Sequence, residues 1–225
     1  MDHQRLRLDD EAAVVWAKLD GVVRGFIVEK GTPGFSTTLQ HGKFSLRASV
    51  TSELHFQDCR IPKDNILPEV SGLKGPLSCL TQARYGIAWG AVGSAMASFD
   101  CARKYSVSRI QFDKPIASFQ LVQAKLAEML SEITKGQLVS LRLAQMKDAG
   151  TMTPQHVSLA KRNNVKIALD IARVARDVLG ANGVTHEYPV GRHMMNLESV
   201  ITYEGTHDIH TLILGHEVTG IAAYS

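Results

Sequence analysis

The spacing of apolar residues divides the chain into a β-rich beginning and a helical remainder. Residues 12–30 contain two runs of β-forming residues, AAVVWAKL and VVRGFIVEK, joined by Asp20-Gly21. Such a pair between two β-rich runs is a strong hairpin signal. Further strands are expected at 37–39 and 53–60, before Pro62 and Pro68 mark a loop. These strands predict one small sheet, which is marginal by itself.

From Gly75 onward, apolar residues recur at spacings of three and four, which is typical of amphipathic helices. Thr153-Pro154 is an N-cap residue followed by proline at the first helical position. The pattern predicts helices at 77–107, 118–148, 153–179 and 206–222, with a short segment at 194–200. The chain is therefore predicted to be α+β, with a partial antiparallel β-barrel or sheet (1–70) followed by an antiparallel four-helix bundle (75–225).

Composition narrows the class of protein. The chain has 225 residues, of which 44% are hydrophobic and 21% charged, with a net charge of +3. Its 25 Lys and Arg residues are scattered among 22 acids, so no nucleic-acid partner is expected. The longest uncharged run, residues 85–99, is shorter than the roughly 20 residues that span a bilayer, so no membrane partner is expected. Its small residues predict a helix packed closely on all sides.

Cysteine usage and the N-terminal residues bear on localisation. Cys59, Cys79 and Cys101 are an odd number and form no CxxC pair, which predicts buried free thiols in a reducing compartment. The first residues resemble neither a signal peptide nor a transit peptide. We expect a cytoplasmic protein, or one of the mitochondrial matrix if the source is eukaryotic.

The candidate chemistry centres on ITYEGTHDIH, residues 201–210. Glu204 stands before Gly205 at the predicted entrance of a helix, with Thr206 as N-cap and Asp208 in the first turn. Glycine lets a ligand approach the backbone, and apolar neighbours raise a carboxylate's pKa toward that of a working base. The alternative is an ordinary exposed acid before a helix.

Other polar residues also have two interpretations. His207 and His210 are three apart on a helix, but nothing obvious completes a metal site, so no metal is expected. The sequence LGANG at 179–183 is glycine-rich but follows a helix, which favours a helix C-cap over a phosphate loop. Arg84 lies in a nearly uncharged helix, where burial without a partner would be costly. Neither a GxSxG elbow nor a Cys-His-Asn arrangement is found.

Five motifs together resemble the acyl-CoA dehydrogenase family, and within it the glutaryl-CoA dehydrogenases. They are LRAS at 46–49, ARYGIAWG at 83–90, RxQFxxPIxxxQ at 109–120, LGANG at 179–183 and TYEGTHDIH at 202–210. The similarity extends from about Val14 to the last residue. The resemblance implies a homotetrameric FAD enzyme with an N-terminal helical domain, a central β-barrel and a C-terminal four-helix bundle.

The resemblance also implies roles for individual residues. Glu204 would remove the α-proton of an acyl-CoA thioester while the β-hydrogen leaves as hydride to the flavin. Some family members carry the base at the position of Ala83, and alanine there leaves Glu204 as the only candidate. Acyl-CoA would contact Leu77, Ser78, Arg84, Tyr203 and Gly205. FAD would contact Arg109, Gln111, Phe112, Gln120, Asp177, Gly180, Ala181, Gly183, Thr206, Asp208 and Tyr224.

Within this set, Arg109, Gln111, Phe112 and Gln120 would reach FAD across a subunit boundary. Arginine pairs with phosphate and phenylalanine stacks on rings, although a solvated Arg and a core Phe are equally ordinary. Ala181 stands where the family usually has a second glycine, which weakens the expected approach of the backbone to phosphate.

The family's N-terminal helical domain and first barrel strands are expected to have no counterpart here, as in a fragment, a split subunit or a truncated reading frame. The implied reaction is oxidation of glutaryl-CoA to crotonyl-CoA with loss of CO2, as in lysine and tryptophan catabolism, with an electron-transfer flavoprotein as acceptor. The arginine that binds the distal carboxylate lies in the missing part. A monocarboxylic acyl-CoA substrate and a non-catalytic oligomerisation module are the alternatives.

Overall fold

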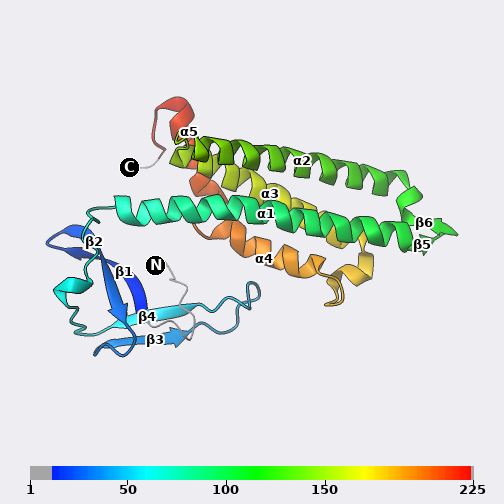
Figure 1. Ribbon diagram of the computed structural model, residues 1–225. Coiled ribbons are helices and arrows are strands. Elements are labelled where there is room, and N and C mark those ends of the chain that lie inside the picture. The colour runs from blue at the N-terminus through cyan, green and yellow to red at the C-terminus, as the bar shows by residue number, and fades with distance from the viewer. Residues whose placement is uncertain (1–11, 224–225) are drawn as a thin grey trace. The chain divides into compact units, whose positions relative to one another are not determined.

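The computed structural model describes residues 12–223, which form two compact units divided between Leu80 and Thr81. Figure 1 shows the order of the elements. The predicted α+β class, with small antiparallel sheets before a set of helices, is confirmed. The division falls inside the first helix, and the expected domain boundaries, 1–70 and 75–225, stay predictions.

The first unit begins with the predicted hairpin. Strands β1 (Ala12–Leu19) and β2 (Val22–Glu29) pair antiparallel, with Leu19 opposite Val22. Asp20 and Gly21 both have positive φ, at 52° and 78°, as a two-residue type I′ turn requires. The hairpin prediction is confirmed.

The expectation of one sheet is wrong for the described residues. Strand β3 (Phe35–Leu39) pairs with β4 (Ser52–Phe56) in a second two-stranded sheet. The chain leaves β2 through a turn with two positive-φ glycines, Gly31 and Gly34, and β3 then pairs with β4 instead of extending the first hairpin. A short 3-10 turn, Lys63–Asn65, leads from β4 toward the first helix.

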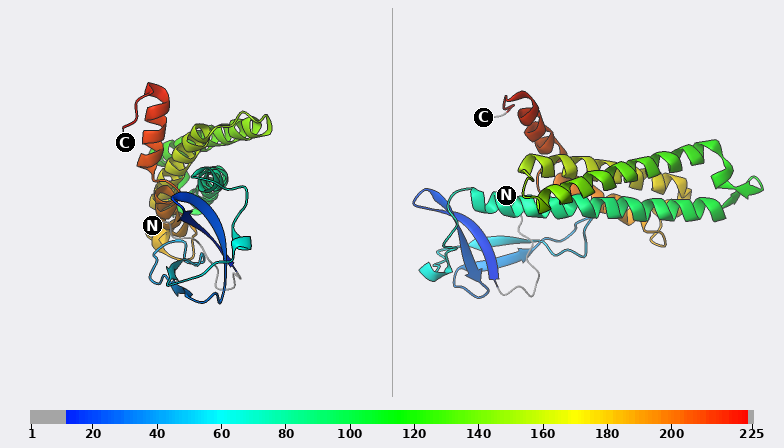
Figure 2. Two further views of the ribbon diagram at one scale, coloured as in Figure 1. Left: turned by 90° about the vertical axis from the view of Figure 1, so that its left-hand side faces the viewer. Right: turned by 45° about the horizontal axis from the view of Figure 1, so that its top comes forward.

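The second unit is a helical bundle. Helix α1 (Lys74–Ser108) begins in the first unit. It is followed by α2 (Gln120–Asp148), α3 (Pro154–Val178), α4 (Val190–Thr202) and α5 (His207–Thr219). Helices α1 to α4 share one apolar core, and α3 packs on α2, α4 and α5. Figures 1 and 2 show α1 to α4 side by side, with α5 at one end.

The core is built from small residues and one buried amide. Ala88, Ala95 and Ala102 of α1 are fully buried. Asn164 of α3 is also fully buried, and its Nδ2 donates to the Ala88 carbonyl of α1 (3.1 Å) and to Ser140 Oγ of α2 (2.8 Å). A buried amide is tolerated only when such partners are supplied, so Asn164 fixes the register of three helices.

Several details differ from the sequence predictions. Helix α3 has the predicted Thr153 cap, but α4 is longer than the expected 194–200, and α5 stops at Thr219 because Gly220 is left-handed, with φ 73°. Helix α1 is not packed on all sides, because Trp89 and Met96 are exposed. The three cysteines are free, but Cys79 is exposed, so buried thiols were wrongly expected there.

A small hairpin between α1 and α2 was not predicted. Strands β5 (Ile110–Gln111) and β6 (Lys114–Pro115) pair across Phe112 and Asp113, and a 3-10 turn (Ile116–Ser118) leads into α2. Both turn residues have positive φ without being glycine, at 51° and 62°. No helix in the described part of the chain is long and apolar enough to cross a membrane.

Two glycines give a paired test of this packing. A Cβ at Gly183 would stand 2.2 Å from the carbonyl oxygen of Arg176, whereas a Cβ at Gly215, inside α5, meets nothing within 4 Å. Gly183→Ala is expected to lower the free energy of unfolding by about 1–3 kcal/mol. Gly215→Ala is expected to raise it by up to about 1 kcal/mol, because alanine favours helix. Urea unfolding followed by circular dichroism measures both, and equal effects would contradict the packing described.

Candidate active site

The Glu204 turn joins the end of α4 to the start of α5. Tyr203 is extended at the end of α4, and then Glu204 and Gly205 both have positive φ, at 54° and 88°. Thr206 caps α5 by accepting a hydrogen bond from the Ile209 amide (3.2 Å), as predicted, and Asp208 lies in the first turn. A left-handed glutamate is uncommon and costs about 1 kcal/mol or more, so other groups must hold this turn.

Two cations from other helices hold the turn by its carbonyls. Lys161 of α3 donates from Nζ to the carbonyls of Tyr203 (2.9 Å) and Gly205 (2.7 Å). Arg84 of α1 donates from Nε to the carbonyl of Glu204 (2.7 Å). Three successive carbonyls therefore each accept a charge-assisted hydrogen bond.

Lys161 is almost completely buried, at 1% exposure. Burial lowers the pKa of its ammonium to about 8, against the opposing effect of the Glu204 carboxylate and with a smaller contribution from Arg84. The ammonium is therefore still largely protonated at neutral pH. A buried Lys is rare unless its donors are used, and the turn carbonyls use two of the three.

His210 of α5 packs against Gly205 of the turn. It is fully buried, and a Cβ on Gly205 would lie 3.0 Å from its Nε2 and 3.3 Å from an Arg84 terminal nitrogen. Burial, followed by the charges of Lys161 and Arg84, lowers the pKa of His210 to about 4. The imidazole is neutral at physiological pH, and position 205 has no room for a side chain.

Glu204 itself is half-buried, with its Oε2 shielded from solvent. This surrounding differs from that of an ordinary exposed acid before a helix. Arg84, which needed a partner, finds one in the backbone of the same turn, and Tyr203 is half-buried beside it. Arg84, Tyr203, Glu204 and Gly205 are thus brought together.

Other residues of the expected acyl-CoA and FAD sets lie elsewhere. Leu77 and Ser78 belong to the first unit, on the first turns of α1, where Leu77 is exposed and Ser78 Oγ donates to the Gly75 carbonyl (2.7 Å). Tyr224 lies outside the described residues, as do Met1 to Glu11.

His207 and His210 have no third ligand, because residues 12–223 contain no group of three His, Cys, Asp or Glu able to hold a metal ion.

The hairpin after α1 and the residues on either side of it contain four of the expected FAD contacts. Arg109, Gln111, Phe112 and Gln120 are all exposed, and Phe112 is 77% exposed at the tip. Phe112 contacts Phe119 edge-to-face, with ring centroids 6.2 Å apart. An aromatic ring held out by two left-handed residues can stack on a planar ligand.

The end of α3 and the turn after it contain the next four residues of the expected FAD set. Gly180 is left-handed and Ala181 exposed, in a 3-10 turn (Gly180–Val184). Asp177 is exposed and pairs with Lys125 (2.5 Å), which holds its pKa below the usual range. Gly183 is buried against the Arg176 carbonyl, so its lack of a side chain is explained by packing alone.

The FAD set is split between the two ends of α4. The hairpin and the 3-10 turn lie together at one end of the bundle, and Glu204, Thr206 and Asp208 lie at the other (Figures 1 and 2). The 13 residues of α4 place the 3-10 turn about 20 Å from the Glu204 turn, and the length of α1 from Arg84 to Ser108 places the hairpin about 36 Å from it. A single copy of the bundle does not bring both groups to one place.

Sequence reasoning missed Lys161 and Asn164. The detectable signal was their position, because both lie on the stripe of α3 that also carries Val157, Val165 and Ala168, all buried. A lysine at an apolar position of a helix indicates either that the buried face was assigned wrongly or that the ammonium is buried with hydrogen-bond partners.

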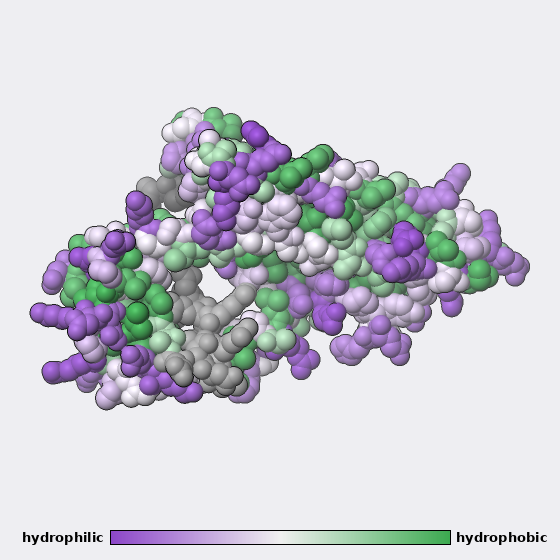
Figure 3. All heavy atoms as spheres, viewed as in Figure 1, coloured by the Kyte–Doolittle hydropathy of each residue, from purple (hydrophilic) through white to green (hydrophobic). Residues whose placement is uncertain are grey.

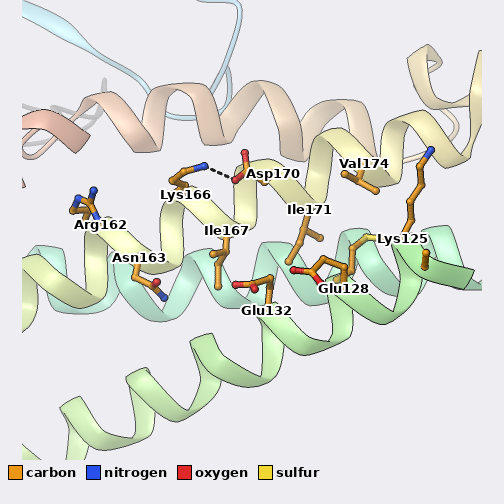
Figure 4. A pocket seen from close by; sticks show the side chains of 12 residues that line it. Lys125, Glu128, Glu132, Arg162, Asn163, Lys166, Ile167, Asp170, Ile171 and Val174 are labelled. Carbon is orange, nitrogen blue, oxygen red and sulfur yellow. Dashed lines mark hydrogen bonds and ion pairs between the residues drawn. The ribbon is translucent and has the colours of Figure 1, made fainter. Parts of the chain in front are cut away.

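A separate groove runs between α2 and α3 (Figure 4). Its volume is about 830 Å³, and charged side chains line its rim, including the Lys166–Asp170 ion pair. Its lining includes neither the turn residues nor Lys161.

Comparison with known proteins gives the family. Residues 71–219 match the model of the acyl-CoA dehydrogenase C-terminal domain. The chain belongs to the acyl-CoA dehydrogenase family. This family uses FAD.

Individual relatives and solved structures support the same family assignment. The mitochondrial short-chain specific acyl-CoA dehydrogenase of Homo sapiens is 35% identical over 212 residues, which cover 91% of this chain and 52% of the relative. A crystal structure of glutaryl-CoA dehydrogenase from Mycobacterium smegmatis superposes with a TM-score of 0.94 at 52% identity, covering 96% of this chain and 56% of that one. A second structure of that enzyme, in complex with FADH2, gives a TM-score of 0.94 at 48% identity with the same coverage. The chain thus spans about half the length of these acyl-CoA dehydrogenases.

The buried imidazole predicts a dependence of stability on pH. Between pH 6.5 and about 4, His210 takes up a proton in the unfolded chain but not in the folded one, so acidification favours unfolding. The free energy of unfolding should fall by about 1.4 kcal/mol per pH unit from this residue alone. In His210→Gln that contribution disappears.

Urea titrations at pH 7.5, 6, 5 and 4.5 measure the effect as the difference between the variant and the parent chain. His186→Gln, at an exposed histidine, is the control. An equal pH dependence in the parent chain and His210→Gln would show that His210 takes up a proton in the folded state.

Proposed function

We propose that this chain carries the catalytic base and the C-terminal bundle of an FAD-dependent acyl-CoA dehydrogenase, with Glu204 taking the α-proton of an acyl-CoA thioester. The observation that carries the proposal is the half-buried Glu204 in a left-handed turn whose three carbonyls are held by Arg84 and Lys161. A base must be fixed in place and partly desolvated to abstract a weakly acidic proton.

The chain's own residues divide the work of proton abstraction. Glu204 accepts the α-proton on its carboxylate. The backbone of Tyr203 and Gly205 flanks the acyl thioester. The half-buried position of Glu204 limits water beside the carboxylate. Leu77 and Ser78, on the first turns of α1, contact the CoA portion.

The residues present fit FAD in chemistry. When bound, the flavin accepts the β-hydrogen as hydride. The exposed Phe112 offers a stacking surface and Arg109 a phosphate partner, with Gln111 and Gln120 as amide donors. Asp177, held by Lys125, suits a ligand hydroxyl better than a phosphate. Thr206 and Asp208 and the backbone of Gly180, Ala181 and Gly183 complete the proposed set.

Glutaryl-CoA is the proposed substrate, with decarboxylation to crotonyl-CoA. The support is the similarity to the Mycobacterium smegmatis enzyme, 52% identical, against 35% for the human short-chain enzyme. The short-chain relative favours a second candidate, oxidation of a monocarboxylic acyl-CoA. In this proposal, the residues that select between glutaryl-CoA and a monocarboxylic acyl-CoA lie outside the matched C-terminal domain, residues 71–219.

A homotetramer is proposed because the bundle leaves apolar side chains uncovered. Leu130, Leu138 and Leu141 of α2 are each more than half exposed, and apolar patches are visible on the bundle in Figure 3. The separation of the FAD set along α4 fits a site completed by a second copy. Light scattering is expected to give four times the 24.6 kDa of one chain, and a monomer at all concentrations would contradict this. An electron-transfer flavoprotein is the proposed acceptor.

The test of the base is flavin reduction. The chain is titrated with FAD, followed by flavin absorbance and fluorescence, and glutaryl-CoA or butyryl-CoA is then added without oxygen. Flavin bound to the parent chain is expected to bleach. Glu204→Gln should bind FAD equally and bleach about 10²–10⁴-fold more slowly, as expected for loss of a general base.

Glu217→Gln, at an exposed acid of α5, is the matched control and should bleach at the parent rate. Bleaching of Glu204→Gln at the parent rate would refute the assignment. A stable tetramer that binds no flavin would favour a non-catalytic oligomerisation module, the alternative function.

A further inference from the structure

The search for further function leads to the buried lysine under the turn. Lys161 lies on α3, 43 positions before Glu204, yet its ammonium donates to the carbonyls on both sides of that residue, at 2.9 and 2.7 Å. Its side chain is almost completely buried, at 1% exposure. A solvent-exposed lysine would gain little stability from such contacts. In a buried lysine, the hydrogen bonds to carbonyls replace the hydrogen bonds to water that burial removes.

The turn needs this support. Two successive left-handed residues, one of them not glycine, are expensive for a free chain. Arg84 is hydrogen-bonded to the middle carbonyl and Lys161 to the carbonyls on either side of it, so Lys161 restrains the rotation of the Tyr203 and Gly205 peptides about Glu204. The direction of the Glu204 side chain follows from those peptides.

We propose that Lys161 is a positioning residue for Glu204, fixing the left-handed turn through the carbonyls of Tyr203 and Gly205. The inference rests on the proposed function, in which Glu204 is the base. Lys161 does not touch the reacting atoms.

The test measures the conformation of the turn and the rate of flavin reduction separately. Lys161→Met keeps the length of the side chain and removes all donors, and Lys161→Gln keeps a neutral donor. Lys166→Met, at an exposed lysine on the same helix that pairs with Asp170, is the matched control. Hydrogen exchange by mass spectrometry is measured on the chain without FAD or substrate.

In Lys161→Met, amides of residues 200–212 are expected to exchange at least tenfold faster, while the middle of α1 and α2 keeps its protection. In the same variant the rate of flavin bleaching at saturating acyl-CoA should fall about 10²-fold with little change in the acyl-CoA concentration for half-maximal rate, as expected for a displaced base. Lys161→Gln should recover part of both effects, and Lys166→Met should show neither.

Three outcomes decide against the proposal. Unchanged exchange at 200–212 in Lys161→Met would show that the lysine does not hold the turn. Faster exchange with an unchanged bleaching rate, when Glu204→Gln is inactive, would leave the base assigned and remove the positioning role. If Glu204→Gln bleaches normally, the proposed function fails first and the positioning role with it. If Lys161→Met does not fold, Lys161→Gln gives the same comparison.

Discussion

The left-handed conformation of Glu204 and Gly205 is the constraint on which the candidate site depends. If the chain left the end of α4 without these two left-handed residues, the Glu204 side chain would point in another direction. The first turn of α5 would then not be set by the Thr206 cap. Here the reversal is completed in two residues, and Thr206 then caps α5. Position 205 has no room for a Cβ between His210 and Arg84, so the glycine is required by both conformation and space.

The turn is held from three helices at once. Lys161 comes from α3, Arg84 from α1 and His210 from α5, and all three are wholly or partly buried. Burial lowers the pKa of the imidazole, and the two nearby cations lower it further. The arrangement is stable only because the cations donate to carbonyls, which concentrate partial negative charge at the centre of the turn.

The sequence predicted the elements that local chemistry decides. Asp20-Gly21, Thr153-Pro154 and Thr206 each specify a turn or a cap by their own side chains or lack of them, and each appears where expected. Phe112 and Asp113 carry no such signal, because non-glycine residues at positive φ are set by tertiary context. The partners of Lys161 lie more than forty residues away, and no periodicity reveals them.

The distribution of the proposed cofactor residues constrains how such a site can be assembled. Helix α1 keeps the exposed Phe112 hairpin about 36 Å from Arg84 and the Glu204 turn, and α4, held in the core by the buried Val190 and Leu197, keeps the 3-10 turn about 20 Å from it. Bending one copy would expose that core. In the proposed tetramer a second copy supplies one of the two groups, and the exposed leucines of α2 are an apolar surface available for that contact.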